Sequence, residues 1–149
     1  LRTPVASRVI KTAARNPVIL ATTNKAKVSR SARFRGIPGV EVMAAGRGER
    51  VSLKTLLRKL ARRDIVSVFT EGGGELAGSL FDGSLVDEVL FFIAPKIIGG
   101  PYSSVKGLGV SDISDSLGLK EPEVSMSGPD IFIRGYVDQT PGDKKCSAG

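Results

Sequence analysis

The sequence predicts an α/β fold, and three observations lead to this expectation. Two short apolar runs, 18–23 and 40–44, have the length and composition of buried strands. From Ser52 the apolar residues change to a helical period, and a β-branched run, 65–70, follows that helix at once. A helix that leads directly into a buried strand is typical of a βαβ unit. Strands 40–44 and 65–70 are therefore expected to be parallel.

The helix expected over residues 52–63 is amphipathic. Its apolar stripe, at i, i+3, i+4, i+7 and i+8, consists of Leu53, Leu56, Leu57, Leu60 and Ala61. Ser52 is placed to cap the N-terminus with its hydroxyl. Five outward residues are basic, and we interpret them as a solvated face rather than a binding patch: Lys54, Arg58, Lys59, Arg62 and Arg63.

The composition excludes several chemistries. The chain has 149 residues, one Cys and no His, so it cannot build a Ser-His-Asp or Cys-His pair, a Cys-rich zinc site or an intrachain disulfide. We expect a cytoplasmic protein without a metal site. No apolar run approaches the roughly 20 residues that span a bilayer, so no membrane partner is expected. The first residue is Leu rather than Met, which suggests a processed or excerpted chain.

The net charge of +7 is unevenly distributed. Residues 1–63 carry 16 basic and 2 acidic side chains, whereas residues 64–149 carry 6 basic and 13 acidic ones. This asymmetry indicates a polyanionic partner, which could be nucleic acid, a membrane surface or a phosphate-bearing small molecule. The basic stretch 25–35 contains Phe34 as its one aromatic residue, so a solvated loop or irregular helix is favoured over a nucleic-acid patch.

Glycines follow the strand expected at 65–70. Glu71 is followed by Gly72, Gly73 and Gly74, and a helix is expected directly after them. Glycines let a ligand approach the main chain, and a helix N-terminus offers N–H groups to a phosphate. The spacing of Gly72, Gly74 and Ala77 matches the dinucleotide fingerprint, although the acidic residue at the end of the next strand is missing. A phosphate-binding loop and a purely structural turn both remain open.

The remaining chain is expected to complete an antiparallel part of the sheet. Six consecutive apolar residues, 89–94, indicate a central strand that is covered on both faces. The other predictions are a long loop with one helical turn at 102–118, a hairpin of strands 119–126 and 131–137 about 128–130, and a disordered tail at 139–149 that contains an inert Cys146. We therefore expect one domain over residues 1–138.

Taken together, these segments resemble the reductase domain of riboflavin biosynthesis, which in bacteria is usually the C-terminal half of a bifunctional pyrimidine deaminase-reductase. The resemblance runs from residue 1 to about residue 137. Glu-Gly-Gly-Gly followed by Ala-Pro-Lys-Ile-Ile-Gly-Gly is much more specific than a glycine pattern alone. The matching segments are 1–4, 18–23, 70–80, 85–89, 93–100 and 128–130.

The resemblance implies a dihydrofolate-reductase-like α/β fold, a three-layer sheet with flanking helices and a C-terminal antiparallel hairpin, that binds NADPH. Family domains begin before the stretch at 1–4, so the first strand and helix are expected to be missing. The family reduces the ribosyl group of 5-amino-6-(5-phosphoribosylamino)uracil to ribityl, by hydride delivery to C1′ of the opened sugar. A homodimer that binds this small molecule and no nucleic acid is expected.

The resemblance also assigns site residues. The family's substrate-contacting acid falls on Glu71. The charge asymmetry separately makes Arg2 a candidate contact to the phosphorylated dinucleotide. The family's NADP-binding segment falls on Gly73, Gly74, Glu75, Leu76, Ala77, Gly78 and Ser79. No catalytic proton donor is assigned. Two alternatives remain, namely another NADPH-dependent pteridine or pyrimidine reductase of the same fold, or a basic nucleic-acid-binding module that uses residues 2–63.

Overall fold

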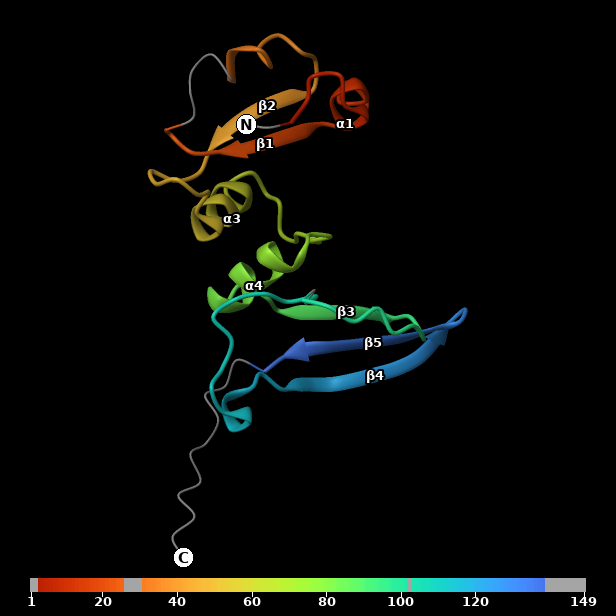
Figure 1. Cartoon of the computed structure of the whole chain (residues 1–149). Coiled ribbons are helices and arrows are strands. Elements are labelled where there is room, and N and C mark those ends of the chain that lie inside the picture. Colours follow the sequence, from red (N-terminus) through yellow and green to blue (C-terminus); the bar gives the residue numbers. More distant parts are fainter. Residues whose placement is uncertain (1–2, 26–30, 102, 139–149) are drawn as a thin grey trace, which may run out of the picture. The chain divides into compact units, whose positions relative to one another are not determined.

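The computed structural model describes residues 3–25, 31–101 and 103–138. The chain divides into two compact units, Leu1–Phe69 and Thr70–Gly149, and each has its own small sheet (Figure 1). Arg2 and the predicted disordered tail with Cys146 lie outside the described residues. Within the described ranges, no helix has the length and apolar character needed to cross a membrane.

The first unit is built around a pair of parallel strands. It contains α1 (Arg8–Lys11), β1 (Val18–Thr22), β2 (Val40–Ala44) and α3 (Leu53–Ala61). β1 and β2 run side by side from the pairing of Val18 with Val40 to that of Thr22 with Ala44. The two strands predicted from the first apolar runs are confirmed, but the parallel partner of β2 is β1.

A small core holds this unit together. The Phe34 side chain is fully buried, and four further apolar side chains are buried in the same unit: Ile10, Ala13, Met43 and Ala45. Gly39 has a φ of +75°, and a Cβ at this position would lie 1.9 Å from the carbonyl oxygen of Ala13. The chain can therefore cross the end of α1 closely because residue 39 is a glycine.

The amphipathic helix is confirmed as α3. The Ser52 hydroxyl accepts the Thr55 N–H at 3.3 Å, as expected of an N-cap. The five outward basic residues are exposed, so the solvated face stays a prediction that their exposure allows. Two of them form hydrogen bonds with residues of β2. The Lys59 ammonium donates to the Ala44 carbonyl at 2.8 Å, and Arg63 donates two hydrogen bonds to the Glu41 carboxylate at 2.6 Å.

The strand predicted at 65–70 does not form, and this prediction is wrong. The segment has no strand pairing, Val66 is 96% exposed and Phe69 is 72% exposed. Residues 66–72 make no backbone hydrogen bond to another described residue. β-branched side chains favour an extended backbone, but a strand also needs the N–H and C=O groups of a neighbour. No described segment supplies them here.

The second unit consists of one helix and an antiparallel sheet. It contains α4 (Gly74–Asp82), β3 (Glu88–Ile93), the short 3₁₀ helix η1 (Ile113–Asp115), β4 (Leu119–Ser127) and β5 (Asp130–Val137). The predicted hairpin is confirmed, because β4 and β5 pair up to Ser127 and Asp130 across a two-residue turn in which Gly128 has a φ of +60°. η1 is the helical turn expected within 102–118.

β3 differs from its prediction as a central, doubly covered strand. The order of the described sheet is β3-β5-β4, so β3 lies at an edge with β5 as its neighbour. Val89 is buried, but Leu90, Phe92 and Ile93 are 40%, 62% and 48% exposed. A continuous apolar run indicates that a strand can be buried, yet the number of neighbouring strands depends on distant segments.

Candidate functional site

The glycine-rich segment forms the N-terminus of α4, as predicted. Gly73 is the N-cap residue, and its carbonyl oxygen accepts the N–H groups of Leu76 at 3.0 Å and Ala77 at 3.1 Å. The N–H groups of Gly74 and Glu75 have no acceptor among the described residues. These donors lie at the positive end of the helix dipole, where an anion is favoured.

Open space lies beside this helix N-terminus. A Cβ on Gly73 would have no atom within 4 Å, so a ligand can approach the main chain there. Glu71 lies three residues before the helix, and its exposed carboxylate has no hydrogen bond or ion pair within the described part of the chain. The carboxylate is therefore available to a hydroxyl or amino group of a ligand.

The other residues of the predicted NADP-binding segment have different environments. Glu75, Leu76 and Ser79 are exposed and Ala77 is half-buried. The Ser79 hydroxyl donates to the Glu75 carbonyl at 2.8 Å, within the helix itself. The segment thus presents main-chain donors at its start more readily than side-chain donors further along.

Gly74 and Gly78 pack against the predicted loop at 103–107, and this contact is the feature that sequence reasoning missed. A Cβ on Gly74 would lie 2.4 Å from the Ser103 carbonyl oxygen, and one on Gly78 would lie 0.7 Å from the Lys106 carbonyl oxygen. Side chains at these positions would therefore collide with the main chain of residues 103–107. The spacing of four residues between the two glycines was the available signal, since it places them on one helix face.

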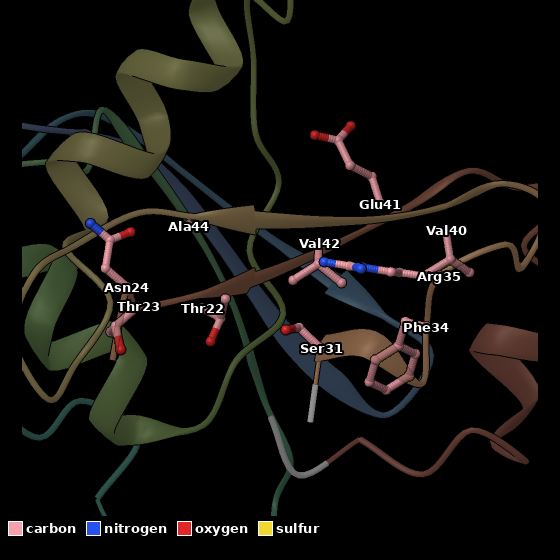
Figure 2. Close-up of a pocket in the computed structure, with 10 residues that line it drawn as sticks. All are labelled: Thr22, Thr23, Asn24, Ser31, Phe34, Arg35, Val40, Glu41, Val42 and Ala44. Atoms are coloured by element: carbon pink, nitrogen blue, oxygen red, sulfur yellow. The ribbon is translucent and has the colours of Figure 1, made fainter. Parts of the chain in front are cut away.

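A pocket of about 620 Å³ lies in the first unit, lined by the carboxyl end of β1 and by residues along the length of β2 (Figure 2). Polar side chains of Thr22, Thr23, Asn24 and Ser31 line it together with the ring of Phe34 and the guanidinium of Arg35. Ligands of α/β proteins commonly bind at such strand ends. The signal for this pocket was the polar run 22–24 directly after a buried strand, although no site residue was predicted there.

The charges at this pocket favour an anion. Glu41 also lines it, but Figure 2 shows its carboxylate directed away from Ser31 and Phe34. The guanidinium of Arg63 pairs with this carboxylate and holds the pKa of Glu41 below its ordinary value. Arg35 has no acidic partner within the described part of the chain. A phosphate could therefore pair with Arg35 and the nearby hydroxyls.

Parallel strands with a polar pocket at their ends, and a helix that starts with open main-chain donors, are features of α/β domains that bind phosphorylated ligands. A family model described as the RibD C-terminal domain matches residues 1–133. The chain belongs to this family. The resemblance found in the sequence is thereby confirmed.

Individual relatives support the same family. The chain is 33% identical over 144 residues to riboflavin biosynthesis protein RibD of Actinobacillus pleuropneumoniae, covering 95% of the chain and 38% of that protein. It is 34% identical over 138 residues to the 2,5-diamino-6-ribosylamino-4(3H)-pyrimidinone 5′-phosphate reductase of Methanothermobacter thermautotrophicus, covering 91% of the chain and 62% of that protein. The chain therefore spans less than two thirds of the length of both relatives.

Solved structures confirm the predicted fold class. RibD of Acinetobacter baumannii matches with a TM-score of 0.71 at 22% sequence identity, over 91% of this chain and 35% of that one. The chain thus has the mixed α/β fold class of RibD, with one parallel and one antiparallel sheet in the described residues.

Proposed function

We propose that the chain is a reductase domain of riboflavin biosynthesis that reduces the ribosyl group of 5-amino-6-(5-phosphoribosylamino)uracil to ribityl. The observation that carries this proposal is the open N-terminus of α4, which lies inside the segment that matches the family. The name of the Methanothermobacter relative describes a reductase of a ribosylaminopyrimidine phosphate, a substrate of the same chemical class.

We propose NADPH as the cofactor, which supplies the hydride that is added to C1′ of the opened sugar. The free N–H groups of Gly74 and Glu75 bind the pyrophosphate, and the helix dipole stabilises its charge. The open side of Gly73 leaves room for the phosphate oxygens. Glu71 accepts a hydrogen bond from a hydroxyl or amino group of the pyrimidine substrate and orients it for reduction.

The pocket in the first unit has the chemistry to bind a phosphate group. Arg35 supplies the positive charge, and Thr22, Thr23 and Ser31 supply hydroxyl donors. A phosphate ester is carried both by the substrate and by the 2′ position of NADPH. Titration of the chain with phosphorylated and dephosphorylated forms of each ligand identifies which phosphate the pocket binds.

The remaining predictions on partners are part of this proposal. We propose that the chain forms a homodimer, which sedimentation velocity would detect as a species of twice the monomer mass. The basic face of α3 is proposed to be solvated rather than bound to nucleic acid. Stabilisation by NADPH without stabilisation by duplex DNA in thermal melts is the expected result, whereas salt-sensitive DNA binding without a response to NADPH would favour the nucleic-acid module. Cytoplasmic localisation stays a prediction.

Replacing Gly73 with Val tests the cofactor site. The φ of −73° suits any residue and a Cβ at this position would have no protein atom within 4 Å, so the helix is expected to form. We expect the Kd for NADPH to rise about tenfold or more, which corresponds to a loss of about 1.4 kcal/mol in binding. The matched control is Gly118→Val, because Gly118 also has open space around its Cβ position. If Gly73→Val and Gly118→Val bind NADPH with equal Kd, the glycine segment is not part of the cofactor site.

Replacing Glu71 with Gln separates substrate binding from cofactor binding. The amide keeps the shape of the carboxylate but removes its charge, so we expect a higher KM for the pyrimidine substrate or a lower kcat. The Kd for NADPH should stay unchanged. If activity is also unchanged, Glu71 does not contact the substrate. The alternative reductase of the same fold is tested by comparing kcat/KM for the pyrimidine substrate with kcat/KM for a pteridine. A higher value for the pteridine would favour the alternative.

A further inference from the structure

One face of α4 is joined to the loop at 103–108 by a set of main-chain and side-chain contacts. The Gly74 carbonyl accepts the Lys106 N–H at 2.8 Å. At the other end of the helix, both carboxylate oxygens of Asp82 accept the Leu108 N–H at 3.1 Å. Residues 74, 78 and 82 follow the i, i+4, i+8 spacing of one helix face. We call these three residues together with 103–108 the glycine seam.

The seam requires glycine on its helix side. Gly78 is buried, and a Cβ there would lie 0.7 Å from the Lys106 carbonyl oxygen. On the loop side, a Cβ at Gly107 would lie 2.7 Å from a carboxylate oxygen of Asp82, which is the end of a side chain that can rotate. The backbones of α4 and the loop therefore approach one another at Gly78 more closely than a side chain there would allow. Neither α4 nor the loop at 103–108 can move independently without breaking these contacts.

The seam and the open donors occupy different parts of the helix. The N–H groups of Gly74 and Glu75 have no acceptor among the described residues, whereas the Gly74 carbonyl is bonded to the loop. The side of Gly73 is open and the sides of Gly74 and Gly78 are filled by the loop. Ligand contact is therefore possible at the first turn, and protein contact occupies the face that includes Gly78.

We propose that the glycine seam positions the N-terminus of α4 for the cofactor, and that Gly78 and Asp82 are positioning residues that do not contact it. This inference rests on the proposed function. The attraction of a helix terminus for an anion is confined to its first turn, so a small displacement of α4 weakens binding. The role inferred for Gly78 thus differs from its assignment as a direct cofactor contact.

The first measurement tests the seam without any ligand. Amide hydrogen exchange of the full chain should show protection of the Lys106 and Leu108 N–H groups, because both are donors in the seam. In Gly78→Ala this protection should be lost. Asp82→Ala should lose the protection of the Leu108 N–H. Asp82→Asn should retain part of that protection, because the amide still offers one carbonyl oxygen as an acceptor. The control Gly118→Ala adds the same methyl group in open space and should change neither amide.

The second measurement tests the positioning role. The Kd for NADPH, measured well below the melting temperature of each variant, should rise about tenfold in Gly78→Ala and less in Asp82→Ala, with partial recovery in Asp82→Asn. The KM for the pyrimidine substrate should move much less than the Kd for NADPH. A general loss of stability would change both together. The smaller perturbation at Asp82 keeps the test decisive if Gly78→Ala does not fold.

The outcomes separate the two proposals. Protection of Lys106 that survives in Gly78→Ala overturns the seam. Loss of protection with an unchanged Kd for NADPH overturns the positioning role and leaves the proposed function standing. A wild-type chain that does not bind NADPH, in spite of protected Lys106 and Leu108 amides, counts against the proposed function and with it against positioning of this cofactor.

Discussion

The two units of the molecule are stabilised in different ways. The first unit buries complete side chains, with Phe34 fully enclosed and Met43 and Ile10 each 4% exposed. Among the described residues of the second unit, Val89 is the one buried large apolar side chain. Its compactness depends instead on backbone pairing in the sheet and on the close contacts of Gly78 and Gly135.

This difference has a functional consequence. The second unit leaves apolar side chains on its surface, and the exposed Phe92 ring lies 4.9 Å from that of Phe132 in a tilted pair. Larger exposed apolar patches on soluble proteins mark interaction surfaces. The first unit has instead a polar pocket and most of the positive charge, which suits a phosphorylated ligand. The first unit is thus rich in positive charge around a polar pocket, whereas the second unit exposes apolar side chains on its sheet.

The largest expected effect comes from the core of the first unit. Phe34→Ala removes a fully buried ring, so we expect the free energy of unfolding of that unit to fall by about 4 kcal/mol. Phe92→Ala in the second unit should cost about 1 kcal/mol, because that side chain is 62% exposed. The two losses of unfolding free energy are measured by denaturant titration of each variant, followed by hydrogen exchange in each unit. Equal losses would show that the two units do not differ in how they are stabilised.

A smaller effect tests whether the first unit also depends on a close backbone contact. Gly39→Ala combines a positive φ with a Cβ that would lie 1.9 Å from the Ala13 carbonyl oxygen, so we expect a loss of about 3 kcal/mol. Gly36→Ala has nearly the same φ, +76°, in open space and should cost about 1 kcal/mol. Thermal unfolding compares the two. Similar losses would mean that backbone strain, rather than the contact with Ala13, decides the effect.

The smallest effect concerns two of the ion pairs, one taken from each unit. Glu41 pairs with Arg63 in the first unit and Glu88 with Arg134 in the second, and all four side chains are between 30% and 48% exposed. Because solvent screens such pairs, we expect Glu41→Gln to cost about 0.5 kcal/mol at neutral pH. The corresponding change at Glu88 should be of similar size, which thermal unfolding of both variants would check.

The Glu41 pair also predicts a pH dependence of stability. The Arg63 guanidinium lowers the pKa of Glu41 in the folded chain, mainly through their side-chain hydrogen bonds. The stabilisation is therefore fully present above the unfolded-state pKa of Glu, about 4.3, and is lost as the pH falls through the lower folded-state pKa. The difference in stability between wild type and Glu41→Gln should shrink below about pH 4. A difference that stays constant with pH would contradict this pairing.

Several elements were predictable because local signals define them. The stripe of α3 with its Ser52 cap, the start of α4 at the glycines and the hairpin turn at Gly128 all depend on residues within a few positions of one another. The wrong predictions concern pairing. The run 65–70 has the side chains of a strand but no neighbour within the described residues, and β3 has one neighbouring strand rather than two. Strand pairing depends on segments far apart in the chain, which local composition does not describe.

The candidate site shows the same division. By itself the sequence determined the glycine-led helix terminus, the acid at position 71 and the family resemblance, because each is a short pattern of residue types. Only the tertiary structure decided that Gly78 faces the loop at 103–108 and that Arg35 lines one pocket with the polar end of β1. The physical reason is that a glycine permits close approach of any backbone or ligand, and the folded chain selects which one approaches.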